Sequence, residues 1–306
     1  MHYLSGRAPT GPATPMNYRH EFHAGNAADV FKHVVLLQLL RRLQHKPAPL
    51  SYVDTHAGRG SYALELGGAA RTREFQRGIA RLWQGRGAAD LPPALADYLA
   101  RVAELNSSGE LARYPGSPRL VRSILRPDDR MILCELQLAE AAALRDEFSV
   151  RGEHGARRDP QVAIHQRDGY EALTALLPPT PRRGLVLIDP PYERPDEFAA
   201  AVAGLALARQ RWPQGCAALW YPIKGPLAAT LLHAAVLRSG LRDVLCAELR
   251  TRPDDPAILS GSGLLLAGAP WQTDTALRAL LPDLAARLAE EPEFSGSARV
   301  DWLVAP

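Results

Sequence analysis

The chain has 306 residues, of which 46% are hydrophobic and 23% are charged, a balance typical of a folded globular protein and not of a disordered one. The formal net charge of +3 permits an anionic partner but does not require one. The sequence contains no apolar run of membrane-spanning length and no signal-type apolar core at its start, so we expect a cytoplasmic protein without a membrane partner.

Residues 1–15 are rich in Gly, Pro, Thr and Ala, and this composition predicts a disordered tail. We interpret residues 16–306 as one domain. Apolar residues at helical spacing predict a helix over 27–43, and the segment "LSYVDTHAGRG" that follows predicts a strand ending in a glycine-rich turn. From about 71 to 111 the pattern is helical and polar, which indicates an inserted small helical subdomain.

After this insertion, strand-like and helix-like segments alternate, which is typical of an α/β fold with a parallel sheet. The predicted strands are 130–135, 161–166, 184–189 and 216–222, and the predicted helices lie near 137–150, 196–211 and 226–239. Two last strands, 243–249 and 263–268, are joined by a loop and should therefore be antiparallel. The prediction is a seven-stranded, mostly parallel sheet with an antiparallel hairpin at its far edge.

Three cysteines, Cys134, Cys216 and Cys246, each lie in an apolar run that reads as a strand. We expect all three to be buried free thiols. Because no Cys-x-x-Cys pair is present, we expect no metal site.

Polar residues follow the predicted strands. Gly58 and Gly60 of "VDTHAGRGSYA" match Gly-x-Gly-x-x-Ala, which also fits a dinucleotide fingerprint, but no strand ends in an acid about 20 residues later. Glu135 closes the next strand and is placed to accept hydrogen bonds from ribose hydroxyls. Asp168 precedes Gly169 and is placed to accept from an adenine amino group. A helix-terminal acid at 135 and an ordinary Asp-Gly turn at 168 remain alternatives.

Residues 185–194, "LVLIDPPYER", carry the most specific signal. Asp189 and Pro190 each precede a proline and are therefore held in extended geometry, and the prolines end the ladder because they lack an N–H. Asp189 and the carbonyl of Pro190 become fixed acceptors beside Tyr192, at the strand edge where α/β proteins bind ligands. Four strand ends therefore carry acids at the same predicted edge: Asp54, Glu135, Asp168 and Asp189. Together they predict a nucleoside site beside an acceptor site, as in S-adenosylmethionine-dependent methyltransferases acting on base amines.

The segments "YRHEFHAGNAADVFKH", "YVDTHAGRG", "YPGSP", "RRGLVLIDPPYE" and "ALWYP" resemble the RlmJ family of 23S ribosomal RNA adenine-N6 methyltransferases, from about Met16 to the C-terminus. Residues 1–15 precede the family's usual start. The resemblance implies a Rossmann-like class I methyltransferase fold, S-adenosylmethionine as cofactor and adenine 2030 of 23S ribosomal RNA as substrate. We expect a monomer.

The resemblance also implies the site residues. Asp189 meets both the cofactor and the substrate amine, Tyr18 lies against the RNA, and Lys32 is a further candidate for the cofactor carboxylate. The residues implied at the S-adenosylmethionine site are His33, His56, Ser117, Glu135, Asp168, Gly169 and Asp189.

Two side-chain roles come from the residue types alone. Tyr192 is expected to stack on the substrate base, which is worth about 1–3 kcal/mol. Four cations are expected near the edge that carries Asp189, where contact with RNA phosphates and simple solvation are equal alternatives for each: Arg182, Arg183, Arg194 and Lys224.

Two other functions remain open from the sequence: a DNA adenine-N6 or guanine-N2 methyltransferase, and a non-catalytic RNA-binding module with the same fold. The Asp-Pro-Pro-Tyr motif alone does not separate the first from an RNA enzyme. Its intact acid argues against the second.

Overall fold

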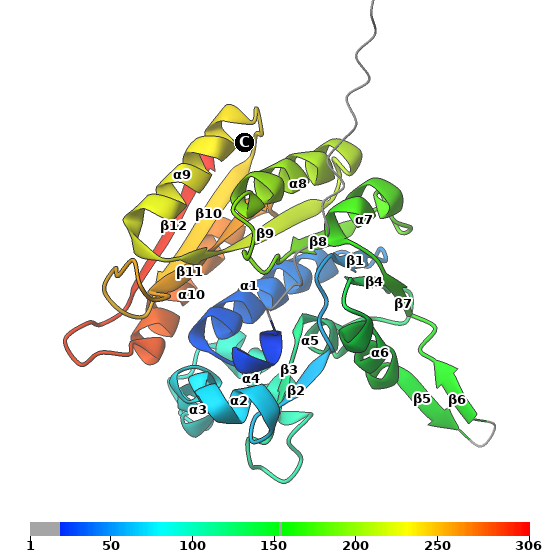
Figure 1. Cartoon of the computed structure of the whole chain (residues 1–306), viewed down its shortest axis with the longest axis horizontal. Coiled ribbons are helices and arrows are strands. Elements are labelled where there is room, and N and C mark those ends of the chain that lie inside the picture. The colour runs from blue at the N-terminus through cyan, green and yellow to red at the C-terminus, as the bar shows by residue number, and fades with distance from the viewer. Residues whose placement is uncertain (1–18, 153–154) are drawn as a thin grey trace, which may run out of the picture.

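An eight-stranded sheet forms the centre of the protein in a computed structural model, which describes residues 19–152 and 155–306 (Figure 1). The strand order is β12-β10-β11-β9-β8-β1-β4-β7. Five of these strands run parallel to one another: β1 (Ser51–Asp54), β4 (Arg130–Glu135), β7 (Val162–Gln166), β8 (Gly184–Ile188) and β9 (Cys216–Ile223). The predicted α/β class and mostly parallel sheet are confirmed.

The far side of the sheet differs from the prediction. Strand β11 (Gly261–Ala267) lies antiparallel between β9 and β10 (Val244–Arg250), so the predicted hairpin exists but is not the edge. The edge is β12 (Ser297–Val304), which pairs antiparallel with β10 and makes eight strands instead of seven. Strand β12 contains the exposed charges of Arg299 and Asp301 between its apolar residues, which an edge strand facing solvent can carry. Because these charges break the apolar run, the sequence pattern did not indicate a strand here.

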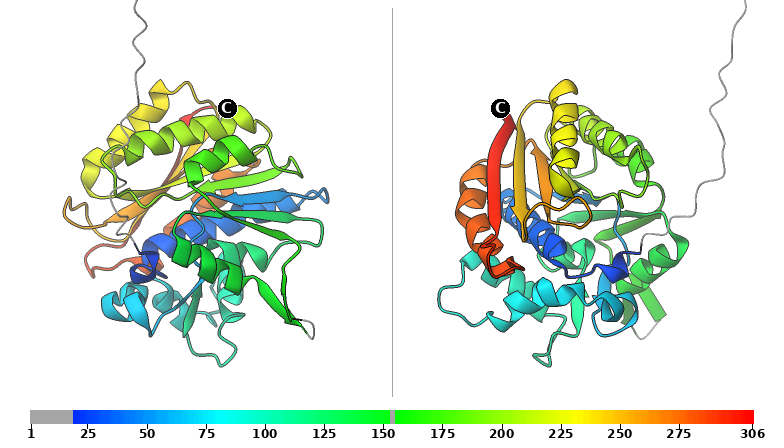
Figure 2. Two further views of the ribbon diagram at one scale, coloured as in Figure 1. Left: turned by 45° about the vertical axis from the view of Figure 1, so that its right-hand side comes forward. Right: turned by 60° about the vertical axis from the view of Figure 1, so that its left-hand side comes forward.

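Helices cover both faces of the sheet (Figures 1 and 2). Side chains alternate along each strand, so Leu185 and Leu187 pack on one face while Val186 and Ile188 pack on the other. The first face carries α1 (Ala27–Gln44), α4 (Pro93–Ala103), α5 (Ser117–Arg122), α6 (Leu138–Glu147) and α10 (Thr273–Leu288). The second carries α7 (Gly169–Leu176), α8 (Glu197–Arg211) and α9 (Gly225–Arg238).

The predicted helix over 27–43 is confirmed as α1, and the cysteines are buried free thiols as expected. Three α-helices were not predicted: α5, α7 and α10. Helix α7 begins at the Asp-Gly pair that also reads as a turn, and α10 contains Pro282 in its interior, which breaks the usual helical pattern.

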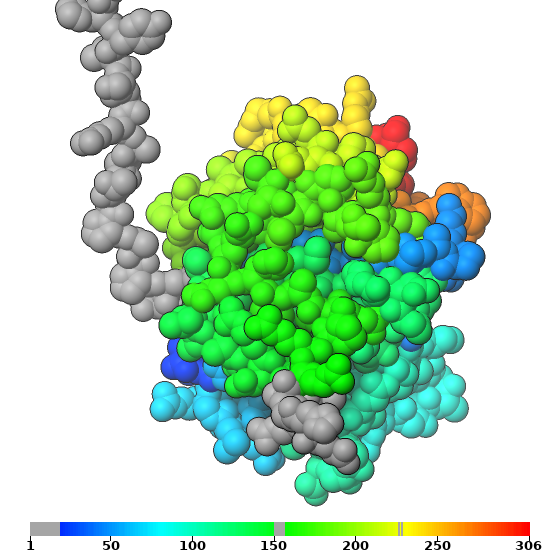
Figure 3. All heavy atoms as spheres, turned by 90° about the vertical axis from the view of Figure 1, so that its right-hand side faces the viewer, coloured from blue at the N-terminus to red at the C-terminus, as the bar shows by residue number. Residues whose placement is uncertain are grey.

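Smaller elements lie beside the sheet. Strands β2 (Ser61–Ala63) and β3 (Arg113–Pro115) form an antiparallel pair. The chain between them forms α2 (Gly67–Thr72), η2 (Glu74–Arg77), α3 (Ile79–Gln84) and α4, and η1 (His20–Phe22) precedes α1. Strands β5 (Ser149–Gly152) and β6 (Gly155–Arg158) form an antiparallel arm after α6 (Figure 1). Green segments from the middle of the chain cover much of the face shown in Figure 3. Among the described residues, no helix is long and apolar enough to cross a membrane.

Candidate functional site

Acidic residues stand at the carboxyl ends of four adjacent parallel strands. Asp54 ends β1, Glu135 ends β4, Asp189 directly follows β8, and Asp168 follows β7 by two residues. Since these strands are neighbours in the order β8-β1-β4-β7, their carboxyl ends form one edge of the sheet. This is the edge where α/β sheets bind ligands.

Glu135 holds the glycine-rich turn after β1. Its Oε2 accepts a hydrogen bond from the Gly58 N–H at 2.9 Å, and its Oε1 accepts from the Gln137 N–H at 2.8 Å. Gly58 has φ +59°, and a Cβ there would lie 2.4 Å from the Tyr62 hydroxyl, so this position requires glycine. Burial raises the pKa of the Glu135 carboxyl, and the two backbone N–H groups oppose that shift. Each oxygen keeps further acceptor capacity for a ligand.

Asp168 caps helix α7. Its Oδ1 accepts from the N–H groups of Tyr170 and Glu171 at 2.8 and 3.0 Å, and both cap bonds end on this one oxygen. The residue after it must be small, because a Cβ on Gly169 would lie 2.4 Å from the Thr55 carbonyl oxygen. Asp168 and Gly169 therefore fix the start of α7 against the turn after β1.

Asp54 organises the middle of the edge. It is fully buried and accepts from the hydroxyls of Tyr52 and Ser117, both at 2.7 Å, and from the His56 N–H at 3.2 Å. Burial lowers the pKa of His56 to about 4, so the imidazole is neutral at pH 7. Its Nδ1 lies 2.7 Å from Thr55 Oγ1. Ser117 and His56, two residues implied at the cofactor, are thus joined through Asp54.

Asp189 is paired with a lysine from α1. Lys32 Nζ donates to Asp189 Oδ2 at 2.6 Å and to Asp29 Oδ1 at 2.8 Å, and the lysine side chain is 5% exposed. Burial alone lowers the pKa of Lys32, but Asp189 and Asp29 outweigh it and hold that pKa well above its usual value. Asp29 also contacts His20 Nε2 at 3.0 Å. The structure thus places Lys32 against the Asp-Pro-Pro-Tyr acid.

Sequence reasoning did not identify Asp29 or His20. The sequence feature that could have identified Asp29 is its i, i+3 spacing to Lys32, because this spacing puts the two opposite charges on the same face of the helix. In the structure both side chains are buried.

A cavity of about 600 Å³ opens in front of Asp189. Its walls include the Asp-Pro-Pro-Tyr segment, Lys32 and Asp29 from α1, and Trp220 from β9. Tyr192 has φ +55°, its hydroxyl donates to the Trp220 carbonyl at 2.7 Å, and its ring packs on Phe198. Asp189 and Tyr192 line this cavity, whereas the residues His33, His56, Ser117, Glu135, Asp168 and Gly169 are not among its walls. Asp189 therefore belongs both to the strand edge and to the cavity.

The hydrogen-bond partner of His33 is Tyr114 and not one of the four strand-edge acids. His33 is 1% exposed, its Nδ1 lies 2.8 Å from the Tyr114 hydroxyl, and burial lowers its pKa to about 3. Its place at the cofactor stays a prediction. Tyr18 lies outside the described residues.

The expected group of phosphate-binding cations is wrong in two members. Arg182 and Arg183 precede β8, so they lie at its amino end, away from Asp189, and Arg183 donates to the carbonyls of Ala48 and Leu43. Lys224 does line the cavity. Arg194 pairs with Asp196 at 3.2 Å.

Comparison with known proteins gives consistent relatives. The family model described as "RsmJ: Ribosomal RNA large subunit methyltransferase D, RlmJ" matches residues 47–304. "Ribosomal RNA large subunit methyltransferase J" of Escherichia coli is 39% identical over 290 residues, covering 94% of this chain and 99% of the relative. The protein of the same name from Haemophilus influenzae is 37% identical over the same shares. The crystal structure of protein LPL1258 from Legionella pneumophila is similar with a TM-score of 0.79 and 31% identity, covering 91% of this chain and 98% of that one.

Proposed function

The chain belongs to the RlmJ family of ribosomal RNA large subunit methyltransferases, and we propose that it transfers a methyl group from S-adenosylmethionine to N6 of an adenine in 23S ribosomal RNA. One observation carries the proposal. Asp189 stands at the strand edge expected to bind the cofactor and also in the wall of the 600 Å³ cavity. A group in that position faces the methyl donor and the acceptor at once. The specific adenine, position 2030, rests on the family resemblance.

The strand edge suits S-adenosylmethionine. Glu135 keeps acceptor capacity on both oxygens for ribose hydroxyls, and Asp168 makes its cap bonds with Oδ1 alone. The close approach of Gly169 to the turn after β1 shapes the edge, with His56 and Ser117 held behind it. When bound, the cofactor supplies an electrophilic methyl group on a positively charged sulfur.

The acceptor side must make a poor nucleophile reactive, because the N6 lone pair of adenine is delocalised into the ring. Asp189 and the Pro190 carbonyl are placed to accept the N6 hydrogens, which favours a pyramidal nitrogen with a localised lone pair. The Asp189 carboxylate then stabilises the positive charge that develops on N6 as the methyl transfers. Lys32, at 2.6 Å, holds this carboxylate in one orientation.

Tyr192 is proposed to stack on the base. Its hydroxyl bond to Trp220 and its contact with Phe198 fix the ring before substrate arrives, so little conformational entropy is lost on binding. Taking the adenine base out of its stack in the RNA costs a few kcal/mol. Stacking of the base on the Tyr192 ring offsets about 1–3 kcal/mol of that cost.

We propose that the protein acts as a monomer in the cytoplasm. The strand edge and the cavity share Asp189, so the proposed reaction requires no residue from a second copy. Sedimentation of the purified protein with and without 23S RNA tests the monomer.

The function is tested by incubating the purified chain with radiolabelled S-adenosylmethionine and, in parallel, 23S RNA, 16S RNA and duplex DNA. We expect label in 23S RNA alone, recovered after nuclease digestion as N6-methyladenosine at one position. Label in DNA or on guanine would establish one of the alternative methyltransferases. Cofactor binding without label in any nucleic acid would contradict the proposal.

A further inference from the structure

A second cluster of polar side chains lies on the sheet face that α9 covers. Tyr221 comes from β9, His233 from α9, and Cys246 and Glu248 from β10. Tyr221 belongs to the core on this face, whereas its neighbour Trp220 packs on the opposite face and lines the cavity near Asp189. The cluster is therefore behind the wall of the acceptor cavity and is not part of it.

A glycine lets the cluster form. Gly263 of β11 is in register with Tyr221 on one side and with Glu248 on the other. A Cβ on Gly263 would lie 2.1 Å from Tyr221 Cζ, so the tyrosine ring crosses β11 directly over the bare glycine. The hydroxyl thereby reaches strand β10, two strands away from its own backbone.

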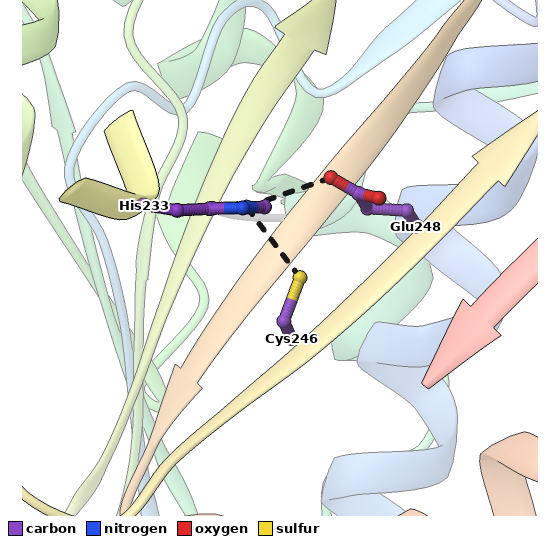
Figure 4. Close-up of side chains that lie close together, drawn as sticks. All are labelled: His233, Cys246 and Glu248. Carbon is purple, nitrogen blue, oxygen red and sulfur yellow. Dashed lines mark hydrogen bonds and ion pairs between the residues drawn. The ribbon is translucent and has the colours of Figure 1, made fainter. Parts of the chain in front are cut away.

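The side-chain atoms of the cluster converge (Figure 4). His233 Nε2 lies 3.6 Å from Cys246 Sγ and 3.5 Å from Glu248 Oε1, and all three ligand-type atoms are within 4.8 Å of one another. The Tyr221 hydroxyl is 2.9 Å from His233 Nε2, 2.9 Å from Glu248 Oε1 and 3.4 Å from Cys246 Sγ. In a tetrahedral zinc site with bonds of 2.0–2.3 Å, neighbouring ligand atoms stand about 3.3–3.8 Å apart. The histidine-to-cysteine and histidine-to-glutamate spacings match this geometry. The two 2.9 Å distances from the Tyr221 hydroxyl are hydrogen-bond distances, so this hydroxyl has to move outward by about 0.4–0.9 Å to act as a fourth ligand.

The charges in the cluster leave room for a cation. Glu248 is 2% exposed. Its Oε2 forms ion pairs with Arg250 at 3.6 Å and Arg299 at 4.0 Å, whereas its Oε1 points toward the cluster and accepts from the Tyr221 hydroxyl. Oε1 and His233 Nε2 lie 3.5 Å apart across the cluster, so a divalent cation between them would contact one carboxylate oxygen and one imidazole nitrogen.

We propose that His233 Nε2, Cys246 Sγ and Glu248 Oε1 bind one divalent transition-metal ion of the Zn²⁺ class, with the Tyr221 hydroxyl in the fourth position. Mixed nitrogen, sulfur and carboxylate ligands select such an ion over Mg²⁺ or Ca²⁺. Binding converts the Cys246 thiol to a thiolate and releases its proton to solvent. The site is structural, since it ties α9 to β9 and β10, and it is independent of the proposed methyl transfer.

This proposal departs from the sequence expectation of no metal site. That expectation relied on the missing Cys-x-x-Cys pair, whereas these ligands come from three separate elements. The same atoms also form a hydrogen-bond network around the Tyr221 hydroxyl, so the experiment must separate the two.

The test uses the full chain without an affinity tag, stripped with a chelator and dialysed. On titration with Co²⁺ alone, we expect a near-ultraviolet thiolate-to-cobalt band that saturates at one metal per chain. With Zn²⁺ alone at a hundredfold excess over its Kd, we expect elemental analysis to find one Zn²⁺ per chain and Tm to rise by about 5 °C.

Cys246→Ser should abolish the band and the Tm shift, whereas Cys216→Ser, which removes another buried free thiol on the same sheet, should keep both. If Cys246→Ser fails to fold, His233→Ala on α9 replaces it, with loss of the metal as the expected result. The proposal is overturned if the wild type retains no metal, if bound Co²⁺ shows no thiolate band, or if the band survives Cys246→Ser.

Discussion

Asp189→Asn tests the central claim about chemistry. The substitution keeps the size of the side chain and a carbonyl acceptor, but it removes the negative charge beside N6. Loss of one fixed group that stabilises transition-state charge typically lowers kcat about 10²–10³-fold. We therefore expect turnover on 23S RNA to fall by that factor, and Asp189→Ala to abolish it.

The same variant should remain folded. Asp189→Asn replaces the 2.6 Å ion pair with Lys32 by, at most, a hydrogen bond to an uncharged amide oxygen, but Lys32 keeps Asp29 at 2.8 Å as a buried counterion. A buried charge left without any partner costs about 3–5 kcal/mol. With one partner remaining, we expect the free energy of unfolding to fall by about 1.5–3 kcal/mol, the value of one charged hydrogen bond.

The assay is single-turnover methylation at saturating cofactor and RNA, with urea unfolding of the same samples. Asp196→Asn is the matched control, because Asp196 belongs to the same loop, is 72% exposed and pairs only on the surface with Arg194 among its described contacts. Retention of more than about 5% of wild-type turnover in Asp189→Asn would remove its charge from the mechanism. An equal loss in Asp196→Asn would show that the loop, not the carboxylate, is responsible.

Three further predictions address the cofactor, the N-terminal segment and pH. Glu135→Ala should weaken S-adenosylmethionine binding about 10- to 100-fold in calorimetry, because a charge-assisted acceptor pair is lost and the Gly58 N–H loses its partner; unchanged affinity would refute the ribose role. A chain starting at Met16 should methylate at the full rate, while Tyr18→Ala should reduce turnover on RNA with little effect on cofactor affinity; the opposite pattern in either variant would show that this role for the segment is wrong. His33 and His56 have folded pKa values of about 3 and 4 against 6.5, so the unfolded chain binds more protons between these values and acid favours unfolding. The free energy of unfolding should fall by about 1.4 kcal/mol per pH unit for each histidine as pH drops from about 6 to 5, and a flat urea series between pH 7 and 5 would contradict the burial of both rings.

Local pattern was enough to predict much of this fold. "GLVLI" is apolar throughout because β8 is buried on both faces, and it is followed by two prolines that end the ladder. The alternation of strands and helices then requires a parallel sheet, whose carboxyl ends must share one edge. For that reason Asp54, Glu135, Asp168 and Asp189 were predicted together from the sequence, and the structure brings their strand ends together.

Local pattern failed where an element depends on its neighbours. Strand β12 carries Arg299 and Asp301 because its outer face is solvated, so no apolar run identifies it. Asp168 and Gly169 read equally well as a turn or as a helix start, and the packing of Gly169 against Thr55 settles the choice.

By itself, the sequence determined the α/β class, the family and the four acids at one sheet edge, because these follow from periodicity and motif along the chain. The tertiary structure alone decided which side chains meet. Lys32 and Asp189 are separated by 157 positions, and their 2.6 Å contact exists because α1 packs across the sheet. Likewise, Tyr221 reaches Glu248 only because Gly263 lies between them in register. Such contacts depend on the direction and depth of each side chain after packing, which periodicity in the sequence does not encode.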